Sequence, residues 1–374
     1  MPGAAERVVL VGPAHPYKGG GARHTTELAH RLAAAGHPTV LESWRAQYPA
    51  ALYPGRQTVH APEGEPYPAT RRDLAWYRPD GWLRTGRRAG RSADLVAVAA
   101  LSPVQVPAYL VLLAGVGRAA RTAVIAHNVL PHERRPGDTA LMRALLRRAG
   151  TVLVHSAEQA GLARGLAPGA DVRAAELPPH LPETGPAPVG RPREPGPPRF
   201  LFFGIVRPYK GVDVLLRAFA AGAPPGALLT VAGEFWGGSA ELRGLARELG
   251  VADRVEFREG YVPAGELGAL FAAADAAVLP YRSATATQNV LLAQRHGLPV
   301  IATRTGTLPD AVRDGADGLL CAPGDPEDLA RALAAFAAPG TAERLRAGAA
   351  EAAARTAART DALWDAYLHA LTAR

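Results

Sequence analysis

Two cations, Arg207 and Lys210, stand in a short loop between an apolar run and a helical pattern. The run at 200–203 ends at Gly204, and apolar side chains recur at helical spacing from 212 to 219. A strand, a glycine-containing loop and a helix in this order place a phosphate at a helix N-terminus. The pattern therefore indicates phosphate binding, although two solvated loop charges would produce the same sequence.

A second glycine-rich loop lies near the start of the chain. Residues 13–21 end in three successive glycines, Gly19, Gly20 and Gly21, between a β-branched run at 8–12 and a helical pattern at 22–35. Consecutive glycines allow a backbone to approach a ligand closely, and they also make a flexible turn. The motif differs from the GxGxxG dinucleotide fingerprint.

Strand and helix patterns alternate along most of the chain, which predicts parallel sheets covered on both faces. Expected strands lie at 39–42, 95–101, 122–126, 151–155, 200–203, 228–232, 255–257, 276–280 and 300–302, and expected helices at 106–117, 141–149, 212–220, 240–249, 264–274, 288–296 and 326–338. Residues 43–90 are rich in tyrosine, tryptophan, arginine and proline and read as an irregular binding surface.

The halves of the chain share this α/β architecture, so we expect two Rossmann-like domains. The N-terminal domain covers 1–180, a proline-rich linker 181–199, and the C-terminal Rossmann-like domain 200–340. The last segment, 341–374, is helical, and we expect it to pack back on the N-terminal domain through the apolar stripe of Trp364, Tyr367, Leu368 and Leu371.

Composition excludes a mainly disordered protein, because 48% of the 374 residues are hydrophobic and 20% are charged. The net charge of +8 comes almost wholly from arginines, which look scattered, and no nucleic-acid-binding motif accompanies them. A GC-rich genome would give the same bias. One cysteine, Cys321, fits a reducing, cytoplasmic location. The uncharged run 95–117 is long enough for a membrane span, but Pro103 and Pro107 interrupt it.

Several loops together resemble bacterial family 4 glycosyltransferases, retaining enzymes of the GT-B fold that use nucleotide sugars. The resemblance covers nearly the whole chain. It rests on VGPAHPYKGGGARHTTELAHRL, AHNVLPHERRPGD, FGIVRPYKGVDVLL, VAGEFW and the long run that begins LPYRSATATQNVLLAQRHGLPV. It implies two Rossmann-like domains that face each other across a cleft. The first, 1–180, would be the acceptor-side domain, and the second, 200–340, would be the nucleotide-sugar-binding domain.

The resemblance also implies roles for individual residues. Lys210 falls on the diphosphate-binding lysine of the family, and Arg207 stands two residues after the usual arginine position, which is Ile205 here. Gly19 and Gly20 match the N-terminal loop that approaches the same phosphates. His127 matches the histidine expected near the donor sugar. The catalytic residues implied are therefore His127, Arg207 and Lys210.

The donor half departs from the family at its Glu-x7-Glu motif, whose glutamates would fall at Ala284 and Leu292. The segment 285–289 is similar to a subgroup that lacks them. Thr287 would cap a helix starting at Gln288, whose N–H groups would hold the β-phosphate. Further donor contacts are expected from Glu234, a substitute for the ribose-binding glutamate, and from Tyr261, Val262, Asn289 and Val290.

The implied activity is transfer of a sugar from a nucleotide-sugar donor to an acceptor hydroxyl with retention, in polysaccharide, glycolipid or secondary-metabolite synthesis. No metal and no permanently bound cofactor are expected, because the chain has no Asp-x-Asp motif. The acceptor would be a sugar, a lipid-linked or a small molecule, with peripheral contact to an anionic membrane as a further expectation. The alternatives are a catalytically silent GT-B partner of another transferase, a GT-B epimerase acting on UDP-sugars and, on charge alone, a nucleic-acid-binding protein.

Overall fold

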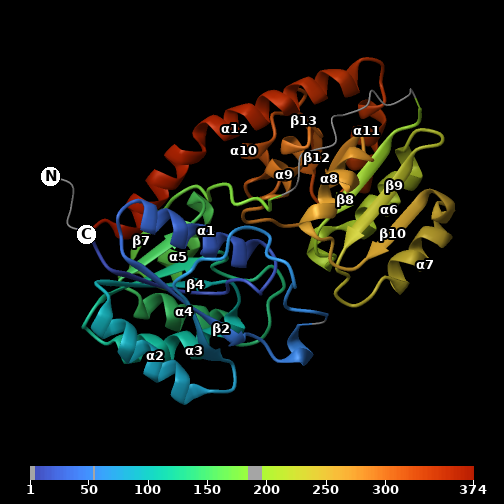
Figure 1. The fold of residues 1–374 in the computed structure, drawn as a ribbon. Helices are drawn as coiled ribbons and strands as arrows, with labels where there is room; N and C mark the ends of the chain where they lie inside the picture. The colour runs from blue at the N-terminus through green and yellow to red at the C-terminus, as the bar shows by residue number, and fades with distance from the viewer. Residues whose placement is uncertain (1–4, 54, 184–195) are drawn as a thin grey trace. The chain divides into compact units, whose positions relative to one another are not determined.

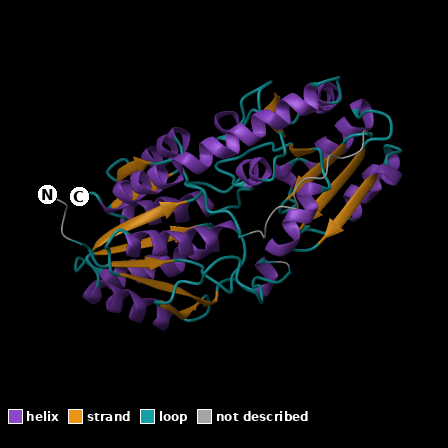
Figure 2. Ribbon diagram, turned by 45° about the horizontal axis from the view of Figure 1, so that its top comes forward, coloured by secondary structure: helices purple, strands orange, loops and turns teal. Residues whose placement is uncertain are grey.

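The computed structural model describes residues 5–53, 55–183 and 196–374. The chain forms two compact units, the first made of Met1–His180 with Thr360–Arg374 and the second of Leu181–Arg359 (Figure 1). Each unit is a parallel sheet with helices on both faces (Figure 2). Most of the expected linker at 181–199 lies outside the described residues.

The first unit is built on a seven-stranded parallel sheet with the order β3-β2-β1-β4-β5-β6-β7. Side chains of each strand alternate between two cores, so Val9 and Val11 pack on one face while Val8 and Leu10 pack on the other. The strands are β1 (Val8–Val11), β2 (Thr39–Ala46), β3 (Thr70–Ala75), β4 (Leu95–Ala100), β5 (Arg121–Ala126), β6 (Thr151–Val154) and β7 (Asp171–Ala174).

Helices cover both faces of this sheet. Leu28 and Leu32 of α1 share one core with Trp364 and Tyr367 of the C-terminal helix, and the other helices pack on the opposite core. The helices are α1 (Gly20–Ala34), α2 (Pro79–Ser92), α3 (Val106–Val116), α4 (Asp138–Arg148), α5 (Ala157–Leu166) and the C-terminal part of α12 (Thr341–Thr372).

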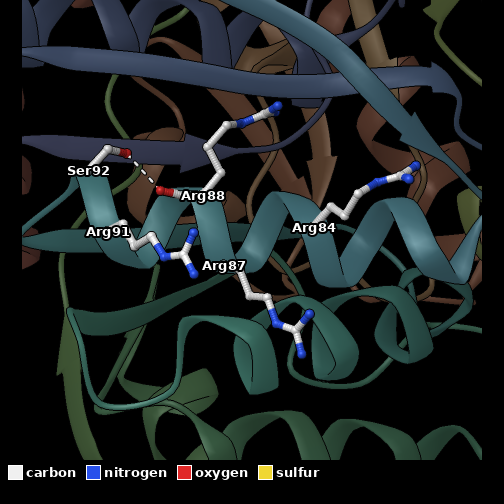
Figure 3. Close-up of a pocket in the computed structure, with 5 residues that line it drawn as sticks. All are labelled: Arg84, Arg87, Arg88, Arg91 and Ser92. Carbon is white, nitrogen blue, oxygen red and sulfur yellow. Dashed lines mark hydrogen bonds between the residues drawn. The ribbon is translucent and has the colours of Figure 1, made fainter.

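The expectation of an irregular segment at 43–90 is wrong. It contains the end of β2, all of β3 and the helix α2. Helix α2 contains three glycines, which have low helix propensity, and few apolar residues, so its helical signature in the sequence is weak. Its glycines allow close packing on α3, since a Cβ at Gly86 would lie 2.0 Å from the Leu112 carbonyl oxygen. The helix thereby presents arginines on its other side (Figure 3).

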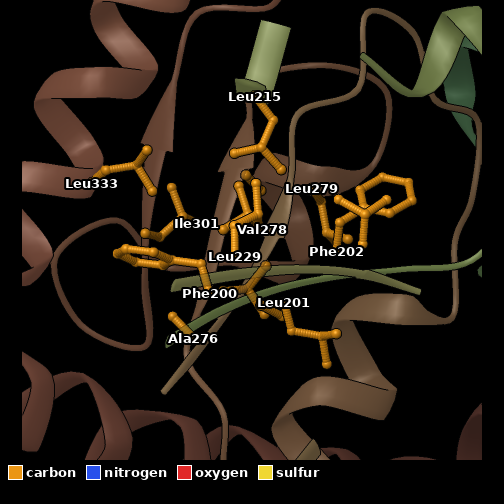
Figure 4. Packing of buried hydrophobic residues seen from close by; sticks show 14 of the residues in the cluster. Phe200, Leu201, Phe202, Leu215, Leu229, Ala276, Val278, Leu279, Ile301 and Leu333 are labelled. Atoms are coloured by element: carbon orange, nitrogen blue, oxygen red, sulfur yellow. The ribbon is translucent and has the colours of Figure 1, made fainter. Parts of the chain in front are cut away.

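The second unit has six parallel strands in the order β10-β9-β8-β11-β12-β13. Phe200, Phe202, Val278 and Ile301 fill the middle of its core (Figure 4). The strands are β8 (Arg199–Phe203), β9 (Leu228–Gly233), β10 (Val255–Glu259), β11 (Ala276–Leu279), β12 (Val300–Thr303) and β13 (Gly318–Cys321), and the helices are α6 (Val212–Gly222), α7 (Ala240–Glu248), α8 (Ala264–Ala272), α9 (Asn289–Arg295), α10 (Leu308–Ala311) and α11 (Pro326–Phe336).

In both sheets the strand order reverses at one point. The chain leaves β8 toward β9 and β10 and returns to the other side of β8 as β11, and the first unit reverses in the same way between β1 and β4. Open parallel sheets bind ligands at such switch points, outside the carboxyl ends of the strands. The expected site loops follow β8 and β1, the strands beside these reversals.

The run 95–117 forms the buried strand β4 and the helix α3 rather than one long helix. Among the residues that the structure describes, no helix combines the length and apolar character that a bilayer span needs.

Candidate functional site

Lys210 closes the loop that follows β8. Residues Pro208–Lys210 form one turn of 3₁₀ helix, and Gly211 (φ 68°) is the N-cap of α6. A Cβ at Gly211 would lie 2.0 Å from the carbonyl oxygen of Pro280, so the turn packs directly on the end of β11. Only glycine satisfies both the positive φ and this approach. The lysine is thus fixed at the switch point of the sheet.

The Lys210 ammonium lies over an aromatic ring. Its Nζ is 3.5 Å from the centroid of the Tyr281 ring and 5.1 Å from that of Tyr209. Within the described residues it forms no ion pair. Burial without a counter-charge lowers the pKa of Lys210 to about 7. An anion that enters this position would supply the missing charge.

Backbone hydrogen bonds join the loops after β8, β9 and β10. The N–H of Val206 donates to the Glu234 carbonyl at 2.8 Å, and the N–H of Gly260 donates to the Gly233 carbonyl at 2.9 Å. Gly233 has a φ of 145°, and a Cβ there would lie 1.8 Å from the Gly204 oxygen. These contacts gather the predicted positions Glu234, Tyr261 and Val262 at one edge of the sheet.

Arg207 lies in the same group of loops. Its guanidinium carbon is 4.8 Å from the centroid of the Trp236 ring and 5.8 Å from that of Tyr209. Stacking on aromatic faces orients a guanidinium while it keeps its charge. The structure therefore places both predicted cations on aromatic side chains of adjacent loops.

The loop after β11 is tied to β8 by Asn289, whose side-chain N–H groups donate to the Phe203 carbonyl at 2.9 Å and to the Tyr281 hydroxyl at 3.0 Å. The predicted helix start at Gln288 is one residue early, since α9 begins at Asn289 with Gln288 as its N-cap. Thr287 still approaches the first turn, because its hydroxyl accepts from the Asn289 N–H at 3.2 Å.

An ion pair between Arg282 and Asp213 supports the turn that carries Lys210. Arg282 donates to both carboxylate oxygens of Asp213, at 2.7 and 2.6 Å, and also to the Pro208 carbonyl at 2.8 Å. The Arg282 guanidinium lowers the pKa of Asp213. This ion pair was missed in the sequence, where two residues 69 positions apart give no sign of pairing.

The glycine loop of the first unit leads into α1. Gly19 (φ 86°) is the N-cap of this 15-residue helix, and no side chain caps it. A Cβ at Gly19 would meet nothing within 4 Å, whereas one at Gly20 would lie 3.8 Å from Nε2 of His180. The helix start is thus open beside Gly19 and borders a histidine beside Gly20.

His127, the first residue after β5, belongs to a cluster of four histidines. His155 directly follows β6, His180 follows β7, and His24 comes from α1. The ring centroids of His24 and His127 are 4.7 Å apart, and those of His127 and His155 are 5.0 Å apart. Tyr367 stacks on His155 at 5.8 Å.

Several nitrogens of this histidine cluster are buried and have no hydrogen-bond partner among the residues that the structure describes. They are both ring nitrogens of His24, both of His155, and Nε2 of His127. Burial lowers the pKa of His127 to about 4 and that of His180 to about 3, and it lowers the pKa values of His24 and His155 as well. The four rings are consequently neutral near pH 7.

Two observations separate this cluster from a metal centre. In the described part of the chain, no group of three or more His, Cys, Asp or Glu side chains is arranged to hold a metal ion. The rings meet mainly edge to face, with the planes of His24 and His127 at 87°. Only His127 was predicted. The other three stand next to strand ends or the glycine loop, which is the signal that could have revealed them.

The predicted residues thus fall into two groups. Lys210, Arg207, Glu234, Tyr261, Val262 and residues 287–290 gather in the second unit, and Gly19, Gly20 and His127 lie at strand ends of the first unit. Leu292, which stands where the family has its second glutamate, is 4% exposed and belongs to the hydrophobic core.

Comparison with known proteins finds its family match within the second unit. Residues 197–338 match the family model described as glycosyl transferases group 1. The D-inositol 3-phosphate glycosyltransferase of Actinosynnema mirum is 42% identical over 159 residues, which are 40% of this chain and 38% of that protein. Its counterpart from Streptomyces griseus is 40% identical over 163 residues, 40% of this chain and 34% of that protein. The chain thus spans well under half the length of the curated relatives it matches.

Solved structures match over nearly the whole chain. Sucrose-phosphate synthase from Thermosynechococcus elongatus has a TM-score of 0.70 at 20% identity and covers 97% of this chain and 100% of its own. Alr3699/HepE from Anabaena, solved in complex with UDP and glucose, has a TM-score of 0.74 at 17% identity. The match covers 99% of this chain and 100% of that one. The predicted GT-B fold is confirmed, and the family match supports the resemblance for residues 197–338, while membership of family 4 and of the subgroup without the glutamates stays a prediction.

Proposed function

We propose that the chain is a glycosyltransferase with a nucleotide-sugar donor. The match of residues 197–338 to the family model described as glycosyl transferases group 1 supports this proposal. The observation that carries the proposal is Lys210. The lysine lies over Tyr281 at the switch point, and no carboxylate among the described residues pairs with it, so its protonated form needs a counter-charge from a ligand. The diphosphate of a nucleotide sugar supplies that negative charge, and the neighbour from Anabaena was solved with UDP.

The proposed reaction moves the sugar with retention. The acceptor hydroxyl oxygen forms a bond to the anomeric carbon as the bond from that carbon to the β-phosphate oxygen breaks. The nucleoside diphosphate leaves with the electron pair, and the hydroxyl proton passes to the departing phosphate. Lys210 and Arg207 neutralise the charge that develops on the leaving group. His127 binds the donor sugar. Neither a metal nor a bound cofactor is part of the proposal.

The acceptor carries a hydroxyl on a sugar, a lipid-linked or a small molecule, and the product belongs to polysaccharide, glycolipid or secondary-metabolite synthesis. A second candidate is a catalytically silent protein that binds a nucleotide sugar and assists another transferase. The burial of Leu292, where the family has a glutamate, favours that candidate.

A thermal-shift screen of UDP-, GDP-, ADP- and TDP-sugars tests donor binding. We expect one nucleotide class to raise the unfolding temperature, and no stabilisation by any of them would contradict the proposal. Turnover separates the two candidates. Release of the nucleoside diphosphate in the presence of an acceptor supports the transferase, whereas binding with no release from any acceptor tried supports the silent protein.

A further inference from the structure

Helix α2 presents a continuous stripe of arginines. Arg84, Arg87, Arg88 and Arg91 stand at i, i+3, i+4 and i+7, so they share one face of the helix. With Ser92 they line an open pocket of about 510 Å³ (Figure 3). The expectation that arginines are scattered is wrong here. Residues 70–92 hold seven arginines and two aspartates, a net charge of +5 against +8 for the whole chain.

Two charges of the stripe have no ion-pair partner in the described part of the chain. Arg84 pairs with Asp80 at 2.7 Å, and Arg88 pairs with Glu42 and Asp73 at 2.7 and 2.8 Å. Arg87 and Arg91 form no ion pair within the described residues, and both are exposed. The opposite face of α2 packs closely on α3 through Gly86 and Gly90, which holds the stripe in place.

Two exposed aromatic side chains precede the helix. Trp76 and Tyr77 lie in the turn between β3 and α2, are 43% and 52% exposed, and meet edge to face with centroids 5.4 Å apart. Large exposed aromatics are uncommon on a surface that meets only water. Tryptophan and tyrosine beside basic residues are typical of surfaces that enter the headgroup region of a bilayer.

The exposure and the length of the arginine stripe indicate which kind of anion it can bind. A small free anion is normally held by enclosed donors, but the side chain of Arg84 is 67% exposed and that of Arg88 39%. The stripe runs for about 10 Å along the helix, which is long enough to meet several headgroups at once. We propose that the arginine stripe of α2, with Trp76 and Tyr77, is a docking surface for an anionic lipid bilayer.

This inference refines the expected membrane contact by assigning it to particular residues, and it does not depend on the proposed glycosyl transfer. Two unpaired arginines should together change partitioning onto an anionic surface about 30-fold at moderate ionic strength. The exposed aromatics add a contribution that salt does not screen. Docking should therefore weaken, but not vanish, as salt rises.

Sedimentation with vesicles tests the assignment. We expect the full chain to pellet with phosphatidylcholine vesicles that contain about one third phosphatidylglycerol, and not with phosphatidylcholine alone. Arg87→Gln with Arg91→Gln should weaken this binding about 30-fold. Arg217→Gln with Arg247→Gln, which removes the same charge from exposed positions of α6 and α7, should leave it unchanged.

Trp76→Ser with Tyr77→Ser should abolish the binding that survives high salt. An equal loss of vesicle binding in the α2 double variant and in the control double variant would show that net charge alone is responsible. That result would overturn the proposal. Absence of binding to anionic vesicles, or displacement from them by an RNA oligomer at equal phosphate concentration, would also overturn it. Donor stabilisation in the thermal-shift screen should be the same in all these variants, so that a failure of docking is distinct from a failure of the proposed function.

Discussion

The Lys210 ammonium lies 3.5 Å from the centroid of the Tyr281 ring, with no carboxylate beside it in the described structure. Tyr281 is buried, and its hydroxyl accepts from Asn289. The ring therefore stays in place whether or not the lysine is charged. Its face attracts a cation only modestly, which leaves the lysine poised for an anion.

Replacing this lysine by an apolar side chain should stabilise the second unit. The pKa of Lys210 is lowered to about 7 by burial, whereas an unfolded lysine titrates near 10.4. Protonation thus favours the unfolded chain, so the lysine lowers stability progressively as pH falls from about 10.4 to about 7. We expect Lys210→Met to unfold at a higher temperature than the wild type at pH 7.

Thermal unfolding over a range of pH checks this. The gap between Lys210→Met and the wild type should be largest near pH 7 and should shrink toward pH 10. A gap that stays constant, or a variant less stable than the wild type at pH 7, would contradict the desolvated lysine.

Gly211→Ala should disrupt the lysine turn. The added Cβ meets the Pro280 oxygen at 2.0 Å, and the residue is held at a φ of 68°. Clash and strain should together cost roughly 2 kcal/mol or more of the free energy of unfolding. Gly244→Ala in α7 is the matched control, since its Cβ meets nothing within 4 Å and should gain about 0.5–1 kcal/mol. Urea unfolding would measure both, and equal effects would refute the close approach.

The histidine cluster should make the first unit sensitive to acid. Folded pKa values of about 4 for His127 and about 3 for His180 lie below the unfolded value near 6.5. Stability is therefore complete above pH 6.5 and falls as pH drops toward 4. Each histidine that gains a proton on unfolding contributes a slope of about 1.4 kcal/mol per pH unit.

Denaturant unfolding from pH 8 to pH 4.5, followed by tryptophan fluorescence, should show this decline. The phenylalanine of His155→Phe has a similar volume and no titrating group. The slope of the unfolding free energy against pH should therefore fall by the contribution of about one proton. A wild-type stability that does not change between pH 7 and pH 5 would contradict the neutral, buried state of the four rings.

The sequence predicted the strands well where they are buried on both faces. Runs such as those of β4 and β8 are almost wholly apolar, as strands between two helix layers must be. It failed at 43–90 because α2 replaces apolar core residues with glycines. Gly86 and Gly90 let α2 pack closely on α3 without large apolar side chains. Hydrophobic periodicity detects only such side chains.

The part of the candidate site that follows from the local order of strand, turn and helix could be predicted from the sequence. Gly211 and Lys210 stand where a strand meets a helix, and this local order identified the turn. The partners of the lysine turn are distant in sequence. Tyr281 lies under the Lys210 ammonium and Arg282 binds the turn only because β11 returns beside β8, and no local pattern reports which strands become neighbours.

The most direct measurement is isothermal titration of UDP, and then of the other nucleoside diphosphates, in buffers of different ionisation enthalpy. At pH 8 the free protein holds Lys210 mostly neutral, so diphosphate binding should take up close to one proton, and affinity should fall as pH rises above 7. Lys210→Met should bind about 30-fold more weakly with no proton uptake. Equal affinity in Lys210→Met, or binding by the wild type without proton uptake, would contradict the assignment of Lys210 as the diphosphate ligand.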